Sequence, residues 1–449
     1  MRIGGRRPGA GVADDRLVRA ARNAVFAVFF GNGFLFASWA ARIPQVRAEL
    51  QVGPGVLGII LLFLAAGSTL GTPLSGLIVS WLGETRTVVA MSVAAAAGMA
   101  VAAVGTGVGI PVVAAGLFVF GFGSGTWDVA MNVQGAAVEQ ALGRAIMPRF
   151  HAAWSIGTVT GAGLGAAMVA LGVPVPAHLL AVAAVVAVAV PAAARSFLPA
   201  RHPVPAATPS PTPADSSGAS QASPSHNSPS QASPVPHARP TSRWRGVLAA
   251  WTEPRTLLIG LFVLCMAFTE GTGNDWLSLA VIDGYHAEPA LGTLTFAAFL
   301  AAMTTGRWFG PRLIDAHGRV PVLRGSAAVA LAGLVLIELG MVLPAAVAGA
   351  ILLGLGTSLG FPVGLSSAAD DPRFAATRVS TAASIGYLAF LAGPPSVGFL
   401  ADQVGVLRSL SIAGVLIIAA FFLCRATAPL RPARQPPPGG PPPSEVIRC

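Results

Sequence analysis

Twelve long apolar runs constrain what this chain can fold into more than any other feature. Each has about the 20 residues that a helix needs to cross the hydrocarbon core of a bilayer. Isolated strands leave backbone groups unpaired in lipid, and these runs are too long and too uniformly apolar for the alternating strands of a membrane barrel. The sequence therefore predicts an all-α integral membrane protein with twelve transmembrane helices. The predicted spans are 22–43, 55–80, 87–107, 111–136, 151–172 and 177–197, then 256–281, 289–311, 321–341, 344–365, 379–401 and 405–425.

Composition supports lipid as the main solvent and excludes several partners. Only 10% of the residues are charged, against about 25% in a soluble domain. The net charge of +10 could indicate nucleic-acid binding, but the basic residues interrupt apolar runs and form no patch, so no nucleic-acid partner is expected. The three cysteines lack ligand spacing and no Gly-x-x-x-x-Gly-Lys loop is present, so we expect neither a metal site nor a nucleotide or other cofactor. The lipid bilayer is the expected partner, and the chain is expected to act as a monomer.

Low-complexity segments divide the chain. Residues 200–250 are rich in Pro and Ser, and we expect a disordered linker there, with a similar tail over 428–449. An N-terminal arm is expected over 1–21, and the helical bundles over 22–199 and 251–427. With the N-terminus in the cytoplasm, only Arg42, Arg47 and Arg408 of the 28 basic residues fall outside. This bias predicts a protein of the cytoplasmic membrane with both termini and the linker in the cytoplasm.

The two halves repeat one another at a nearly constant offset. Trp39 corresponds to Trp276 at 237 residues, and Gly123 to Gly356 at 233. The Ser-Ile-Gly that ends at Gly157 recurs 229 residues later. Several matches in the same order predict two pseudo-symmetric six-helix bundles, an arrangement typical of transporters.

Short motifs then point to a family. The segment from Asp315 through Gly318 to Arg319 resembles the loop signature Gly-x-x-x-Asp-Arg-x-Gly-Arg-Arg of the major facilitator superfamily (MFS). The first half keeps Gly76 and Gly83 but departs from the charged positions. Three stretches, 41–44, 128–134 and 150–157, are similar to the YbjJ-like, fucose-permease-like bacterial branch of that superfamily. The resemblance implies the MFS fold and a transport function.

Polar residues inside the predicted spans are the candidates for function. Inserting a charged side chain at the bilayer centre costs at least about 2.5–3.5 kcal/mol of free energy. An acid within a predicted span therefore calls for a functional or structural explanation. Desolvation favours the neutral form of a carboxylate, which lets such an acid exchange protons near neutral pH. The proton-coupling candidates are Glu270 as first choice, then Asp128, Asp275 and His151. The alternatives are an acid held protonated or paired with a neighbouring helix, and for His151 a ring bonded to backbone at a helix start.

The resemblance implies that the first, fourth, seventh and tenth spans line a central cavity. The substrate candidates are Asn32, Trp127, Asn132, Trp154, Asn274 and Trp276. The tryptophans, with Trp39, could stack on a sugar ring or an aromatic ligand, but an interfacial belt or packing explains them as well. Arg42 and Arg47 are expected at the outer mouth, and His178 and Glu338 at the membrane interface. Arg307 and Arg312 are expected to snorkel to lipid headgroups.

The sequence thus favours a secondary active transporter that moves a small solute by alternating access and is coupled to protons. Efflux of a drug-like metabolite and uptake of a sugar-like solute both fit. The alternative is a membrane sensor that kept a carrier fold, which the altered first loop signature would suit. An intramembrane enzyme would need a clustered nucleophile and base or metal ligands, and the sequence contains none.

Overall fold

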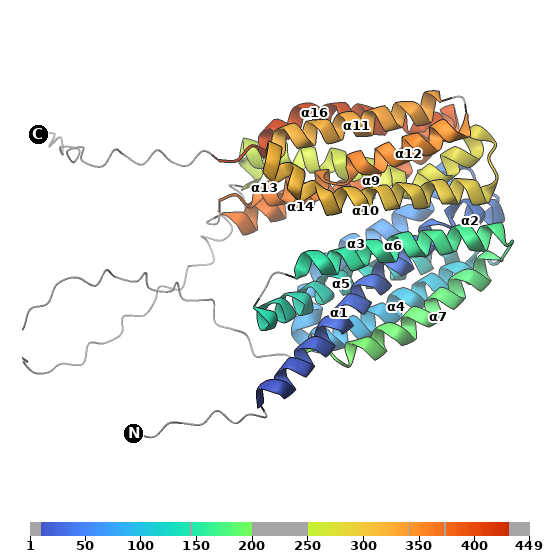
Figure 1. Cartoon of the computed structure of the whole chain (residues 1–449). Coiled ribbons are helices and arrows are strands. Elements are labelled where there is room, and N and C mark those ends of the chain that lie inside the picture. The colour runs from blue at the N-terminus through green and yellow to red at the C-terminus, as the bar shows by residue number, and fades with distance from the viewer. Residues whose placement is uncertain (1–9, 144–145, 200–249, 341, 372–373, 431–449) are drawn as a thin grey trace, which may run out of the picture. The chain divides into compact units, whose positions relative to one another are not determined.

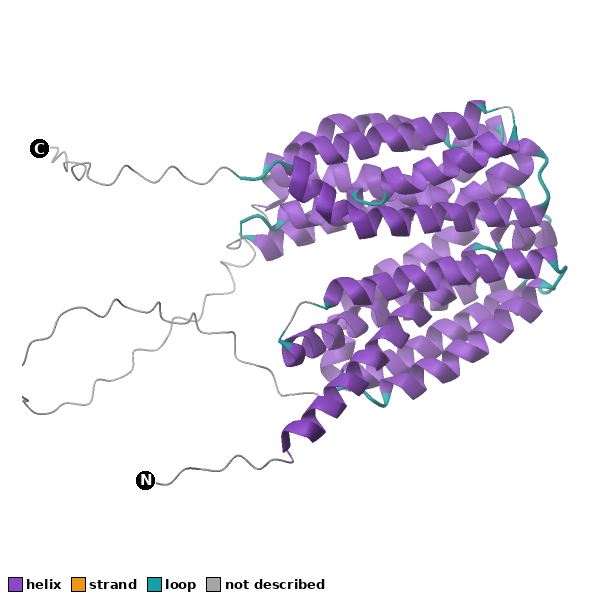
Figure 2. Ribbon diagram, viewed as in Figure 1, coloured by secondary structure: helices purple, strands orange, loops and turns teal. Residues whose placement is uncertain are grey.

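A computed structural model of the chain describes residues 10–143, 146–199, 250–340, 342–371 and 374–430 (Figure 1). Over these residues the regular structure is helical, with no strand (Figure 2). Twelve helical segments among them are long and apolar enough to cross a membrane, which confirms the predicted fold class. The described residues form two compact units: unit 1 contains 10–52 and 60–199, and unit 2 contains 53–59 and the residues from 250 onward.

Unit 1 contains the first six spans and one short helix. Its helices are α1 (Ala10–Ala40), α2 (Ile43–Leu50), α3 (Pro54–Leu82), α4 (Glu84–Gly105), α5 (Ile110–Leu142), α6 (Met147–Ala170) and α7 (Val175–Ala194); the first residues of α3 belong to unit 2. Helix α1 packs on α5, α6 and α7, and α4 packs on α5 and α7.

Unit 2 repeats this scheme. Its helices are α9 (Pro254–Tyr285), α10 (Pro289–His317), α11 (Arg319–Leu339), α12 (Leu343–Thr357), α13 (Gly360–Ala368), α14 (Ala375–Val404), α15 (Val406–Ser409) and α16 (Ser411–Leu423), followed by the 3₁₀ turn η1 (Cys424–Thr427). Helix α9 packs on α12, α14 and α16 as α1 does on its counterparts, and α11 packs on α12 and α16 as α4 does on α5 and α7. The repeat in sequence is therefore a repeat in packing.

Matched glycines explain how the fourth span of each half packs so closely. A Cβ on Gly123 of α5 would lie 2.7 Å from the Ala95 nitrogen of α4. A Cβ on Gly356 of α12 would lie 2.6 Å from the Ser326 oxygen of α11. Only a residue without a side chain lets two helix backbones approach this closely in lipid, so the repeat of glycines preserves one helix contact in both units.

Matched glycines also join successive helices. Gly83 alone separates α3 from α4, and Gly318 alone separates α10 from α11. Their φ angles are 77° and 82°, in a region that glycine enters without strain. The conformation explains why glycine occupies these two positions of the loop signature.

The structure differs from the expected spans in three places. Helix α1 begins at Ala10, well before residue 22, and the short helix α2, with Pro44 in its first turn, was not expected. The tenth span is interrupted between Thr357 and Gly360. The predicted linker and tail lie almost wholly outside the described residues, as does the arm before residue 10.

Candidate functional site

The first-choice acid, Glu270, lies near the middle of α9 and is paired. Its Oε1 accepts a hydrogen bond from Nη2 of Arg307 in α10 at 2.7 Å, and the two side chains are 13% and 27% exposed. The prediction that Arg307 snorkels to headgroups is therefore wrong. Charge-assisted bonds of this kind are stronger than neutral ones, so the guanidinium turns toward the acid of its own unit.

The break in the tenth span supplies a second partner for Arg307. The ring of Pro362 excludes the hydrogen bond that would normally reach the carbonyl four residues earlier, at Ser358, and it clashes with that carbonyl in a regular helix. The freed Ser358 oxygen accepts a hydrogen bond from Arg307 Nε at 3.3 Å. Unit 2 thus holds a carboxylate, a guanidinium and an interrupted helix together, and interrupted helices line binding sites in transporters.

Unit 1 has a neutral cluster at the matching place. Asn32 of α1, which occupies the repeat position of Glu270, accepts a hydrogen bond from Trp154 Nε1 of α6 at 3.0 Å. It also donates to Ser124 Oγ of α5 at 3.4 Å. Asn32 is 5% exposed. Three helices of unit 1 therefore meet in amide, indole and hydroxyl groups, which suit a hydroxylated solute or simply hold the helices together.

Among the described residues, the side chains of the candidates Asp128, Asn132, Asn274 and Asp275 form no ion pair or side-chain hydrogen bond with one another. Asp128 is exposed on α5, and its backbone oxygen accepts a hydrogen bond from Asn132 Nδ2 at 2.8 Å. Asp275 is partly exposed on α9. Oδ1 of the neighbouring Asn274 is buried without a partner among the described residues. Whether residues of the two units converge in one cavity stays a prediction.

The tryptophans divide into two kinds. Trp127 and Trp276 are fully buried, and their Nε1 atoms have no partner within the part of the chain that the structure describes. Packing therefore accounts for both in this structure. Trp154 is only partly buried and bonds to Asn32. His151 is exposed near the start of α6, where its ring lies edge-on to Phe29 with centroids 5.3 Å apart.

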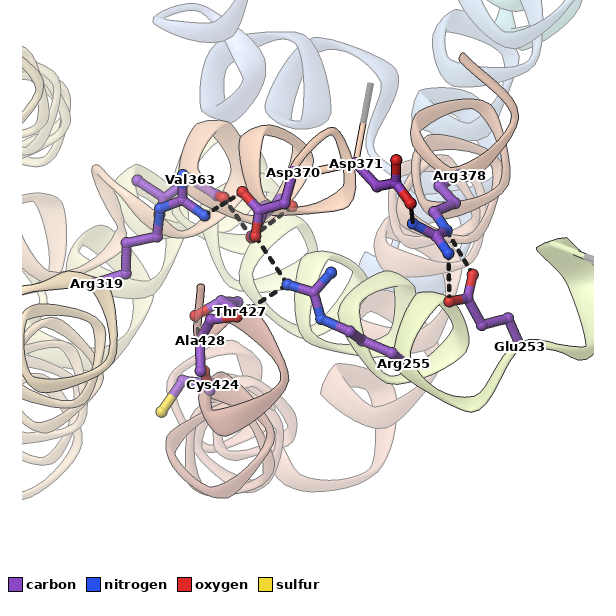
Figure 3. A network of polar contacts seen from close by, with 12 residues as sticks. Glu253, Arg255, Arg319, Val363, Asp370, Asp371, Arg378, Cys424, Thr427 and Ala428 are labelled. Atoms are coloured by element: carbon purple, nitrogen blue, oxygen red, sulfur yellow. Dashed lines mark hydrogen bonds and ion pairs between the residues drawn. The ribbon is translucent and has the colours of Figure 1, made fainter. Parts of the chain in front are cut away.

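The loop motif of unit 2 joins a cluster of ion pairs that the sequence did not predict (Figure 3). Arg319 donates to Asp370 at 2.6 Å, and Arg255 reaches the same carboxylate at 2.8 Å. Beside it, Arg378 pairs with Glu253 at 2.6 Å and lies 3.6 Å from Asp371. The cluster connects the ends of α9, α11, α13 and α14. Asp315, the acid of the motif, is exposed and belongs to none of these pairs.

At the corresponding place in unit 1, a carboxylate accepts hydrogen bonds from backbone nitrogens. Glu139 lies 231 residues before Asp370 in the sequence. Its Oε2 accepts hydrogen bonds from the backbone nitrogens of Ile146 and Met147, each at 2.7 Å, at the start of α6. The loop motif of this unit has no matching charge, and Ser80 bonds to the Leu77 carbonyl of its own helix.

Comparison with known proteins decides the family. A family model described as Major Facilitator Superfamily matches residues 24–372. The chain belongs to the Major Facilitator Superfamily. Among MFS relatives, the uncharacterized transporter y4wD of Sinorhizobium fredii is 31% identical over 379 residues, which cover 84% of this chain and 90% of the relative. An uncharacterized MFS-type transporter of Yersinia pestis is 28% identical over 86% of this chain and 89% of the relative.

Solved MFS structures share the fold. The nucleoside transporter NupG matches with a TM-score of 0.68 at 13% identity, covering 91% of this chain and 98% of NupG. The fucose:proton symporter FucP of E. coli matches with a TM-score of 0.59 at 14% identity, covering 91% and 98%. The protein is accordingly a multi-pass membrane transporter of the MFS and a carrier, as the sequence predicted.

Proposed function

We propose that the protein is a proton-coupled secondary transporter that moves a small hydroxylated solute by alternating access, with Glu270 as the coupling group. The observation that carries the proposal is the ion pair between Glu270 and Arg307. Protonation of Glu270 removes the charge that holds the guanidinium, which frees Arg307 for a solute or for a different contact. A proton and a rearrangement of α9 against α10 are thereby linked, which is what coupling requires.

The chemistry of unit 1 favours a polar solute over an apolar one. Asn32, Ser124 and Trp154 offer an amide, a hydroxyl and an aromatic face, the groups that bind sugar-like rings. The names of NupG and FucP state a nucleoside and fucose as the solutes of those proteins, and both are hydroxylated rings. Efflux of a drug-like metabolite is the second candidate, because the partly buried ring of Trp154 could also stack on an aromatic ligand.

We further propose that the transporter acts as a monomer in the cytoplasmic membrane, with both termini in the cytoplasm. The arginine distribution supports this orientation, because basic residues concentrate in cytoplasmic loops. Cysteine labelling of single-cysteine variants from either side of the membrane tests it.

Transport by purified protein in vesicles tests the coupling. With an imposed pH gradient, we expect accumulation of at least one solute from a panel of nucleosides, deoxyhexoses and drug-like amphiphiles. Glu270→Gln should lose proton-driven accumulation while it keeps exchange of solute in the absence of a gradient. Glu338→Gln, an acid of α11 outside the pair, is the matched control and should keep both activities. Unchanged proton-driven transport by Glu270→Gln, or no transport by the wild type across the panel, contradicts the proposal.

A further inference from the structure

The end of unit 1 formed by the α1–α2 and α6–α7 connections contains a buried charge without a counter-ion. Arg42 separates α1 from α2 and is 2% exposed. Its Nη2 donates to the Val173 carbonyl of the α6–α7 turn, but Nε and Nη1 have no partner among the described residues. The side chain of Arg42, a residue expected at the outer mouth, is thus buried within unit 1. Desolvation makes a buried charge unfavourable unless it is paired.

A histidine beside Arg42 is in the same condition. His178 of α7 is 3% exposed, and neither ring nitrogen has a partner in the described part of the chain. It was expected at the membrane interface and is instead buried. A Cβ on Gly165 would lie 2.4 Å from the Cβ of Ala41 and 3.9 Å from Cε1 of the His178 ring, so the ring lies close to the residue that precedes Arg42. Both side chains therefore have buried nitrogens without a hydrogen-bond partner among the described residues.

The nearest acid does not compensate the charge. Glu49 interacts with Arg42 electrostatically, but it is exposed and is not among the carboxylates that pair with arginine in the structure. Burial lowers the pKa of the Arg42 guanidinium, and Glu49 opposes this only as the smaller influence. Native proteins seldom leave buried polar groups without a partner, so a bound species is required here.

We propose that Arg42 and His178 form a binding site for a compact monovalent anion, a halide or a small carboxylate, within unit 1. An anion accepts hydrogen bonds from several donors at once and neutralises the guanidinium, whereas water satisfies the hydrogen bonds but leaves the charge. Trp39 Nε1, at the end of α1, is a further buried donor without a partner in the described chain. The site is separate from the Glu270–Arg307 pair, which lies in unit 2.

Thermal unfolding of the purified protein tests the site. At one ionic strength, chloride or bromide should raise the unfolding midpoint saturably over gluconate, a larger anion that we expect to be excluded. We expect a rise of about 2–4 °C, the size for a ligand at several times its dissociation constant in a unit of this length. A rise with acetate that exceeds the rise with chloride identifies a carboxylate as the occupant. The same midpoint in all anions overturns the proposal and leaves water as the occupant.

Two variants localise the effect. Arg42→Gln removes the charge and should abolish the dependence on the anion. Arg47→Gln, in the same short helix, removes an arginine that bonds to the Val52 carbonyl and should keep the dependence. An anion response in Arg42→Gln equal to that of the wild type contradicts the proposal. If Arg42→Gln does not fold, crystals of the wild type grown in bromide decide the matter: we expect an anomalous peak beside the Arg42 guanidinium, and its absence overturns the site.

Discussion

The two units share one packing scheme but differ in the polarity of the groups at its centre. Unit 1 has Asn32, Ser124 and Trp154, which are neutral and bonded to one another. Unit 2 has Glu270 and Arg307, which are charged, beside a broken helix. A common scaffold with unequal polar groups fits the proposal that Glu270, in unit 2, is the coupling group.

Disruption of the scaffold should have the largest effect, and an equal one in both units. Gly123→Val and Gly356→Val place a side chain against the backbone of the neighbouring helix. We expect each to lower the free energy of unfolding by about 3 kcal/mol, at the upper end for an overpacked core. Thermal unfolding in detergent measures the change. Gly163→Val is the control, because a Cβ on this glycine of α6 meets nothing within 4 Å. A destabilisation confined to one unit would show that the shared packing is only apparent.

Breaking the Glu270–Arg307 pair should have the second-largest effect, and it should differ from the effect of the matching change in unit 1. Arg307→Met leaves Glu270 without its partner. We expect the free energy of unfolding to fall by about 2 kcal/mol, and we expect proton-driven transport to be lost. In the double variant Glu270→Gln/Arg307→Met the stability should recover while transport does not. Asn32→Ala, the matching change in unit 1, should cost about 1 kcal/mol, because it removes neutral hydrogen bonds. Equal losses for Arg307→Met and Asn32→Ala would contradict the proposed division between the units.

Much of this architecture could be predicted from the sequence, because bilayer thickness dictates the length of a span and lipid demands a helix. The positions of the twelve spans follow from that physics alone. The pairing of Glu270 with Arg307 does not, because it depends on how two helices are rotated, which a uniformly apolar run leaves undefined. The burial of Arg42 and His178 was missed for a related reason, since residues at span ends were assumed to face the interface.

One missed feature did have a sequence signal. Pro362 lies within the tenth predicted span, and proline removes the hydrogen bond to the carbonyl four residues earlier. The repeat position in unit 1 is Val129, and α5 continues through it without a break. The asymmetry of the two fourth spans was therefore readable in the sequence.

This asymmetry can be reversed. Pro362→Val gives unit 2 the residue of unit 1, and we expect α12 and α13 to become closer to one continuous helix. The Ser358 carbonyl would then bond within the helix and no longer to Arg307. The free energy of unfolding should rise by about 1 kcal/mol, because the helix regains a backbone hydrogen bond, while the rate of transport falls; unfolding and vesicle assays measure the two effects. Val129→Ala in α5 is the control and should leave transport unchanged. A rise in stability with full transport would mean that the break has no part in function.

The smallest predicted difference between the units is the effect of removing a carboxylate at the helix ends, Asp370 in unit 2 or Glu139 in unit 1. Asp370→Asn removes the carboxylate shared by Arg255 and Arg319. Because these side chains are partly exposed, we expect a loss of about 1 kcal/mol, and the loss should shrink at high salt. Glu139→Gln in unit 1 weakens two bonds to backbone nitrogen, and its effect should depend less on salt. Unfolding in low and high salt compares the two. The same salt dependence in both variants would contradict the distinction between an ion-pair cluster and a helix cap.

The one-residue connections at Gly83 and Gly318 set a limit on motion within each unit. A single residue spans at most about 3.6 Å, so α3 cannot slide along its axis by more than a fraction of a turn unless α4 moves with it, and the same holds for α10 and α11. During a transport cycle the joined ends of each such pair must therefore stay together, and any change between the two helices is a rotation about the glycine. Distances between spin labels placed next to Gly83, one on α3 and one on α4, should stay constant, whatever conformational state the carrier occupies, and the same should hold for labels on either side of Gly318.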